Sequence, residues 1–128
     1  EVGGPASLVV ADLSFISLKV VFDRLAALCE PQGDLLILVK PQFEAGRAEA
    51  ARGQGIIRSP DVWQRVLEEV SECILKAKFG VMGLMVSPLR GANGNVEFFV
   101  HCRSGVESRV CSKAIEGVVN EAREMVLA

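Results

Sequence analysis

Three charged residues stand at the ends of apolar stretches, at positions where packing alone would not place a charge. The run over residues 8–11 ends at Asp12, the run over 35–39 ends at Lys40, and Glu97 opens a third run. One such charge is usually only solvated. Two acids and an amine that meet at one sheet edge favour an active site instead, and the chemistry open to them is proton transfer.

The surrounding sequence predicts the elements that must position these charges. Ser17 caps a helix, Pro31 and Gly33 end it, Ser59-Pro60 starts a second helix, and Gly80 suits its exit. The predicted order is strand 8–11, helix 18–28, strand 35–39, a mobile loop over 42–58 with a helical turn at 48–51, helix 60–77, strand 81–86, turns over 88–95, strand 96–102 and helix 107–127.

The order of the elements indicates an α/β fold with a sheet that is parallel at first. Short apolar runs such as residues 8–11 are typical of strands covered on both faces, and alternating strands and helices give right-handed crossovers. The last two strands are joined by a short turn and must run antiparallel. Asp12, Lys40 and Glu97 then share the edge at which open α/β sheets bind ligands.

Composition limits the class of protein. The chain has 128 residues, enough for one domain or part of one, and half of them are hydrophobic. The net charge of −2 excludes a generally basic nucleic-acid binder, so any RNA contact must come from a local patch or a missing part. The four cysteines form no zinc pattern and fit a reducing, cytoplasmic setting. No membrane span or signal peptide is visible, and Glu1 in place of Met indicates an excised piece.

Several strings together resemble a known family. They are Ala-Asp-Leu-Ser-Phe-Ile-Ser-Leu at 11–18, Leu-Val-Lys-Pro-Gln-Phe-Glu-Ala-Gly at 38–46, Gly-Gln-Gly-Ile-Ile-Arg at 53–58, Ser-Pro at 87–88 and Gly-Asn-Val-Glu-Phe at 94–98. The chain resembles, roughly from residue 7 to 103, the haemolysin-A-like (TlyA) family of FtsJ-type ribose 2′-O-methyltransferases of ribosomal RNA. The resemblance implies a partial Rossmann-like methyltransferase fold in which an antiparallel hairpin follows the parallel strands and helices lie on the faces.

The resemblance also implies catalytic residues. The family uses a Lys-Asp-Lys-Glu tetrad, in which Asp12, Lys40 and Glu97 match the last three members. The first lysine, the glycine-rich cofactor loop, the acid that holds the cofactor ribose and an N-terminal RNA-binding module have no counterpart here. Residues 1–128 are therefore expected to be the C-terminal half of a methyltransferase domain, and inactive alone.

The implied reaction moves a methyl group from S-adenosylmethionine to a ribose 2′-hydroxyl, without a metal. Lys40 would be the base, and the two acids would orient it and the ribose. Asp12, Ser14 and Phe15 would border the cofactor, although Phe15 could equally be core. The expected partner is ribosomal RNA or a ribosomal subunit.

Other residues have a functional and a structural interpretation. Arg47, Arg52 and Arg58 could bind RNA phosphates or simply keep the loop soluble. Trp63 is interpreted as packing and His101 as an edge or buried histidine.

Two other functions stay open. One is a non-catalytic RNA-binding fragment, and the other is a membrane-active haemolysin-like protein, against which the lack of a basic amphipathic helix counts. A missing upstream strand would also leave an exposed sheet edge beside Val9 and Val10, through which the fragment could self-associate.

Overall fold

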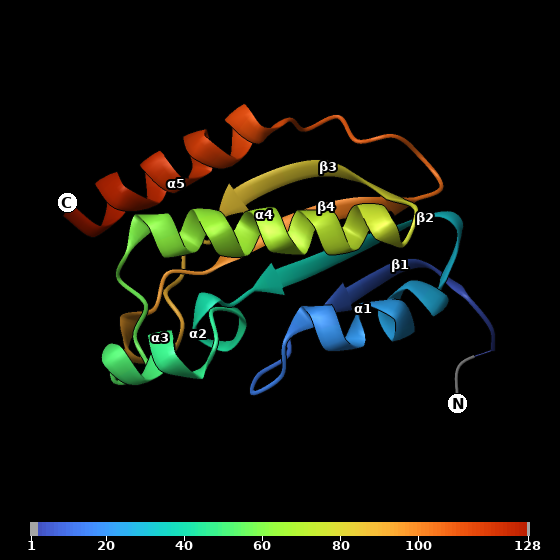
Figure 1. The fold of residues 1–128 in the computed structure, drawn as a ribbon. Helices are drawn as coiled ribbons and strands as arrows, with labels where there is room; N and C mark the ends of the chain where they lie inside the picture. Colours follow the sequence, from blue (N-terminus) through green and yellow to red (C-terminus); the bar gives the residue numbers. More distant parts are fainter. Residues whose placement is uncertain (1–2, 128) are drawn as a thin grey trace.

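The computed structural model describes residues 3–127, which form one mixed β-sheet with helices packed against it (Figure 1). The elements in chain order are β1 (Ala6–Ala11), α1 (Leu18–Ala27), β2 (Cys29–Val39), α2 (Pro41–Glu44), α3 (Arg47–Arg52), α4 (Pro60–Lys76), β3 (Phe79–Val86), the 3₁₀ turn η1 (Ala92–Gly94), β4 (Phe98–Ser104) and α5 (Ser112–Leu127). None of the helices in this range is both long enough and apolar enough to cross a bilayer.

The sheet has the order β1-β2-β4-β3. β1 and β2 run parallel, and β4 runs antiparallel to both of its neighbours, so β1, β2 and β3 all point the same way (Figure 1). This confirms the predicted α/β fold and its antiparallel β3–β4 pair. The ends of β1 and β2 and the beginning of β4 consequently lie at one edge of the sheet.

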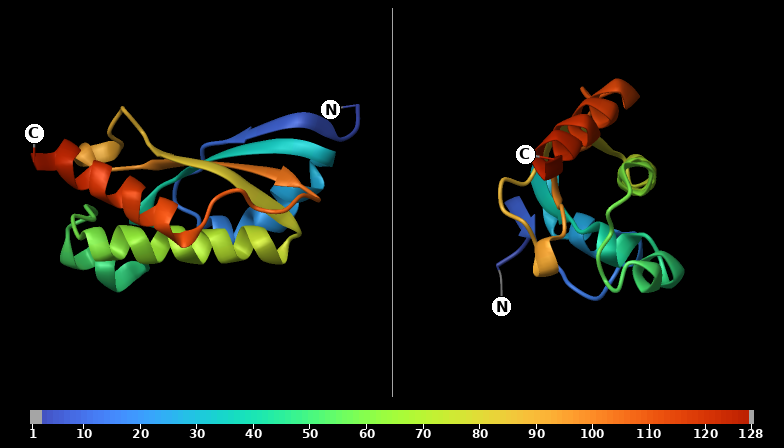
Figure 2. Two further views of the ribbon diagram at one scale, coloured as in Figure 1. Left: turned by 90° about the horizontal axis from the view of Figure 1, so that it is seen from above. Right: turned by 90° about the vertical axis from the view of Figure 1, so that its left-hand side faces the viewer.

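The described helices cover one face of the sheet. α1 packs on β2, α4 packs on β3, and α5 packs beside both α4 and β3 (Figure 2). Leu35 and Ile37 point to this face and are fully buried, whereas Leu8 and Val10 on the other face are 58% and 65% exposed. The prediction that residues 8–11 are covered on both faces is therefore wrong for residues 3–127, because no helix in that range crosses the second face.

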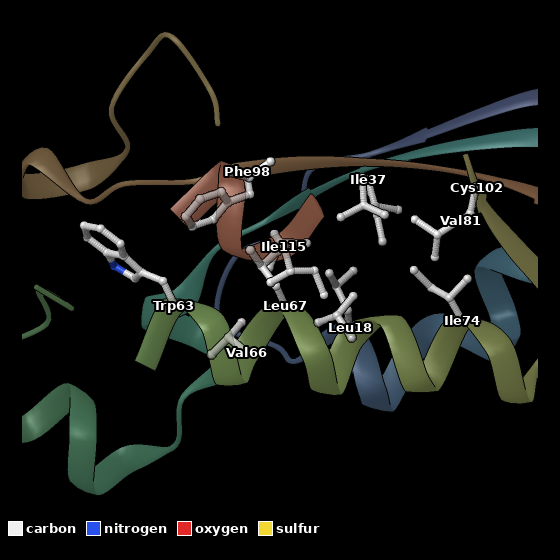
Figure 3. Packing of buried hydrophobic residues seen from close by; sticks show 14 of the residues in the cluster. Leu18, Ile37, Trp63, Val66, Leu67, Ile74, Val81, Phe98, Cys102 and Ile115 are labelled. Atoms are coloured by element: carbon white, nitrogen blue, oxygen red, sulfur yellow. The ribbon is translucent and has the colours of Figure 1, made fainter. Parts of the chain in front are cut away.

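The core lies between the sheet and α4 and extends to α5 (Figure 3). α4 presents a buried stripe at helical spacing, made of Trp63, Val66, Leu67, Val70 and Ile74. The ring of Trp63 packs edge-on against Phe98 with centroids 6.2 Å apart, and its Nε1 donates to the carbonyl of Ile57 at 3.1 Å. The prediction that Trp63 serves packing is confirmed.

The region after β2 is more regular than its sequence indicated. Residues 42–58 were expected to be a mobile loop, yet they contain most of α2 and all of α3. Pro41 occupies the first turn of α2, where its missing N–H costs nothing, and Gly46 joins the two helices at a φ of 96°. Helices of four and six residues are too short to show a period, so the pattern revealed only the turn at 48–51.

The predicted ends of the first two long helices, at residues 28 and 77, agree with the structure, but the residues expected to end them do not. Pro31 and Gly33 lie inside β2, because α1 already ends at its cap Leu28. Gly80 lies inside β3, where it packs against the backbone of residues 106–107, and Lys78 instead makes the left-handed turn after α4 at a φ of 66°. Both α1 and α4 therefore end earlier than the nearest glycine or proline.

Candidate functional site

The parallel ends of β1 and β2 bring Asp12 and Lys40 together. Ala11 is paired with Ile37, and the charged residues follow directly. Nζ of Lys40 lies 2.5 Å from Oδ1 of Asp12 and donates to Oγ of Ser14 at 3.1 Å. The side chain of Lys40 is only 13% exposed, whereas that of Asp12 is 60% exposed. A largely desolvated amine is thus held by an accessible acid and a hydroxyl group.

Glu97 directly precedes the neighbouring strand β4, and its carboxylate has a different partner from this pair. Val39 pairs with Phe98, so the register continued by one residue sets Lys40 opposite Glu97. The carboxylate is 5% exposed and accepts a bond from Nε2 of Gln42 at 2.9 Å. Within the part of the chain that the structure describes, Lys40 and Glu97 form no ion pair within 4.0 Å. Of the three charged residues expected to meet, Asp12 and Lys40 are in contact, and Glu97 lies outside ion-pair distance of Lys40.

Two further residues shape the pocket of Glu97. A Cβ at Gly91 would overlap the carboxylate of Glu97, so this carboxylate could keep its position only beside a glycine. Gln42 is 8% exposed, and its Oε1 is buried with no hydrogen-bond partner in residues 3–127. Such an orphaned acceptor costs stability and is typical of a site rather than of a plain core.

Glu44 ties the loop that carries Asp12 to α2. Its carboxylate is 6% exposed and accepts bonds from the N–H of Leu18 and from Oγ of Ser17, both at 2.8 Å. Burial raises the pKa of Glu44, and the two hydrogen bonds oppose that rise. By anchoring the start of α1, Glu44 fixes the far end of the 12–17 loop and so helps to hold Ser14 beside the amine.

Phe15 stands on the same loop and faces solvent. It is 89% exposed and adopts a φ of 64°, which a residue of this size rarely does. Its ring lies against Phe43, with centroids 4.9 Å apart. The interpretation of Phe15 as core is therefore wrong. A strained, exposed aromatic ring beside the charged pair suits a flat ligand.

The three arginines of the predicted RNA-binding loop have different surroundings. Arg47 is exposed at the start of α3. Arg52 lies 3.6 Å from Glu49, and Arg58 donates to the carbonyl of Gly53 at 3.5 Å. These contacts leave most of the guanidinium donors open.

The histidine and the buried cysteine lie away from this edge. His101 and Arg103 both contact Oδ1 of Asp34 at 2.8 Å on the uncovered face, and these hydrogen bonds lower the pKa of Asp34, that from His101 most. His101 thus lies on the inner strand β4, partly exposed and hydrogen-bonded to Asp34, so its interpretation as an edge or buried histidine is wrong. Burial raises the pKa of Cys102 to about 12, which makes the thiol inert.

Sequence reasoning missed the polar residues that hold the site. Asn95 is 1% exposed and joins the 53–57 segment to the turn before β4. Gln42 and Glu44 bracket Phe43 inside one short helix, and this alternation of polar and aromatic residues directly after Lys40 was the available signal.

Comparison with known proteins identifies a family whose match includes the residues of this site. The profile described as FtsJ-like methyltransferase matches residues 1–104, so the chain belongs to the FtsJ-like methyltransferase family. This confirms the family resemblance seen in the sequence.

Within that family, the chain is similar to proteins with two kinds of name. It is 36% identical over 121 residues to the 16S/23S rRNA (cytidine-2′-O)-methyltransferase TlyA of Mycobacterium tuberculosis, which covers 94% of this chain and 45% of the relative. It is 33% identical over 95 residues to Hemolysin A of Brachyspira hyodysenteriae, covering 74% of this chain and 39% of the relative. The chain thus spans less than half the length of these relatives.

Solved structures share the fold. A protein from Streptococcus thermophilus named "Putative hemolysin" superposes with a TM-score of 0.87 at 37% identity, over 94% of this chain and 44% of the other. A SAM-dependent methyltransferase from Methanosarcina mazei superposes with a TM-score of 0.53 at 12% identity, over 84% and 64%. The second likeness shows the fold alone.

Proposed function

We propose that this chain is the C-terminal half of a methyltransferase domain whose complete protein methylates a ribose 2′-hydroxyl in ribosomal RNA. The observation that carries the proposal is the amine of Lys40, on a side chain that is 13% exposed, held by Asp12 and Ser14 at the ligand-binding edge of an α/β sheet. The cytidine-2′-O activity in the name of the relative TlyA supports the same reaction. A ribosomal substrate also implies a cytoplasmic protein.

Lys40 would take the proton that the 2′-hydroxyl must lose to become a nucleophile. The carboxylate of Asp12 and the hydroxyl group of Ser14 hold the amine at the ligand-binding edge. The family places a further lysine upstream, and a neighbouring cation is a general means by which proteins activate a lysine. After proton transfer, Asp12 would hold the new ammonium group in place.

Glu97 would orient the ribose. Its carboxylate is fixed by Gln42 on one side and by the backbone of Gly91 on the other. A carboxylate that does not move keeps the sugar hydroxyl in line with the methyl donor, and alignment supplies much of the rate in a transfer of this kind.

The residues at the end of β1 fit the methyl donor S-adenosylmethionine. Asp12 offers an accessible carboxylate to a sulfonium cation, and Phe15 offers an open aromatic face to a purine, with Ser14 between them. When bound, the cofactor supplies an electrophilic methyl group. These residues make only part of a cofactor site, and the remainder is proposed to lie in the N-terminal half.

The RNA would follow the basic region beyond the site. Arg47, Arg52 and Arg58 are exposed beside the catalytic edge, where guanidinium groups can bind phosphates. This local patch explains how a chain of net charge −2 would contact RNA.

Substitution of Lys40 in the complete protein tests the function. Lys40→Ala should lower methyl transfer to ribosomal subunits from labelled S-adenosylmethionine by about 10²–10⁴-fold, the usual worth of a general base. Titration calorimetry should show nearly unchanged affinity for the cofactor. Lys19→Ala, which changes a lysine on α1, is the control. Full turnover by Lys40→Ala would exclude the base role.

The position of the methyl group tests the substrate atom. Alkaline cleavage of RNA uses the 2′-hydroxyl as nucleophile, so the methylated nucleotide should resist alkali. A labelled nucleotide that is still cleaved would place the methyl group on a base. Absence of cofactor binding by the complete protein would favour a non-catalytic RNA-binding role instead.

We also propose that the chain can self-associate through β1. Within residues 3–127, β1 pairs only with β2, so its outer edge has unpaired backbone groups beside Val9 and Val10. Light scattering should show dimers or larger species, and Val10→Lys should reduce them. A strictly monomeric chain would contradict this proposal.

A further inference from the structure

A cavity of about 280 Å³ opens beside the candidate site, between the 56–58 segment, the 90–96 turn and the end of α5. Arg58 and Arg90 line it together with Asn93, while Ile57, Trp63 and Val96 contribute apolar surface. None of its lining residues is acidic. A cavity with two cations and an apolar wall attracts an anion more strongly than open surface does, because the low-dielectric wall strengthens the attraction.

The cavity adjoins Glu97. Val96 precedes this residue directly, and Arg90 precedes Gly91, whose backbone lies against the carboxylate of Glu97. An anion bound here would therefore lie next to the acid that is proposed to orient the ribose.

Neither arginine is neutralised by an acid. Arg58 donates only to the carbonyl of Gly53 at 3.5 Å, and Arg90 donates to the carbonyls of Gly94 and Met125, both at 3.3 Å. Neither forms an ion pair within 4.0 Å anywhere in residues 3–127. A guanidinium group has five N–H donors, so both retain donors for a ligand.

The two arginines are held at a fixed spacing by a buried side chain. Oδ1 of Asn95 accepts from the N–H of Ile57 at 3.0 Å, which fixes the segment of Arg58. Nδ2 of Asn95 donates to Gly55 at 2.8 Å and to Ala92, in the turn of Arg90, at 3.0 Å. The cavity is thus built before any ligand arrives, which lowers the entropy cost of binding.

We infer that Arg58 and Arg90 clamp one backbone phosphate of the RNA strand next to the target nucleotide. The inference rests on the proposed function, and it adds a residue outside the predicted loop and a single phosphodiester as the ligand. Guanidinium groups match phosphate oxygens in geometry and stay charged at all relevant pH values. Of the loop arginines, Arg58 is then the one that acts on a defined phosphate.

Binding of a fluorescein-labelled single-stranded 12-nucleotide RNA to the chain tests the clamp by anisotropy. Arg58→Ala and Arg90→Ala should each weaken binding about tenfold, the usual worth of a charge-assisted hydrogen bond. The double variant should lose less than the product of the single effects, because both residues bind one phosphate. In these variants, the slope of the logarithm of the RNA-binding constant against the logarithm of salt concentration should become less steep by about 0.7. Arg24→Ala, at an exposed position of α1, should leave both the RNA affinity and its salt dependence unchanged.

Three results would overturn the clamp: no salt-dependent RNA binding by the chain, single variants that bind as Arg24→Ala does, or fully multiplicative losses. Arg90 also contacts the end of α5, so its variant requires a melting curve. Arg58 donates only to the carbonyl of Gly53 in an exposed bond, so Arg58→Ala is not expected to unfold the chain. If Arg90→Ala unfolds, the RNA affinity of Arg58→Ala alone tests the clamp. Methyl transfer by the complete protein, and its loss in Lys40→Ala, is measured separately, so the clamp can fail while the proposed function stands.

Discussion

Asn95 is expected to be the most sensitive polar position outside the charged pair. Its side chain is 1% exposed and makes three hydrogen bonds, to the N–H of Ile57 and to the carbonyls of Gly55 and Ala92. All three partners are backbone groups, two in the 53–57 segment and one in the 3₁₀ turn η1, and no strand pairing joins these two segments.

The cost of Asn95→Ala follows from these bonds. Each is worth about 1 kcal/mol net, so the loss should be about 3 kcal/mol of the free energy of unfolding. For a domain of this size that is a drop of roughly 10 °C in Tm. Asn95→Asp keeps the acceptor but turns a buried carboxylate toward two carbonyl oxygens. Its deficit should be at least as large at pH 7 and should shrink as pH falls, because protonation restores one donor.

Urea unfolding at pH 7 and pH 5 measures both effects. Asn120→Ala, at an exposed position of α5, is the matched control and should change stability by less than about 0.5 kcal/mol. A loss below about 1 kcal/mol for Asn95→Ala would refute the claim that this residue fixes the two segments. A deficit of Asn95→Asp that does not depend on pH would refute the orientation given to its amide.

Three more substitutions probe the site and the sheet. Gly91→Ala should destabilise by about 1–3 kcal/mol because its Cβ meets the carboxylate of Glu97, whereas Gly117→Ala, in an open helical position, should stabilise by about 0.5–1 kcal/mol; equal effects in urea would contradict this. Gln42→Leu should cost about 1–3 kcal/mol, because Glu97 loses its amide donor; an unchanged unfolding midpoint would mean that the orphaned Oε1 already cancels that bond. Asp34 has a lowered pKa, so its stabilisation is present above its ordinary value near 4 and disappears as pH falls through the lower folded value; the deficit of Asp34→Asn should therefore shrink in acid unfolding below about pH 4, and a constant deficit would exclude the linkage.

The fold class was predictable because strand direction depends on local features. Buried runs separated by an amphipathic helix are typical of strands that run in the same direction, and a short turn reverses the chain. The order of the strands was not predictable in the same way. Nothing in residues 98–104 says that β4 lies between β2 and β3, because periodicity reports which face is buried and not which strand is the neighbour.

The site was predictable only where it depends on strand ends. Asp12 and Lys40 meet because β1 and β2 are parallel neighbours, a relation that the sequence implied. The orientation of Glu97 toward Gln42 was not, because it depends on a four-residue helix and on the space above Gly91. The hydrogen bond between Gln42 and Glu97 joins residues that are 55 positions apart, and such a contact produces no periodic pattern in the sequence.

The central place of β4 has a consequence for synthesis on the ribosome. β4 is the last of the described strands to be made, yet β2 and β3 are joined in the sheet only through it. A nascent chain that stops before residue 97 lacks Glu97, and its β2 and β3 have no strand to join them. Long-range pairing of this kind forms late. Prematurely terminated products would therefore carry Lys40 without the complete candidate site around it.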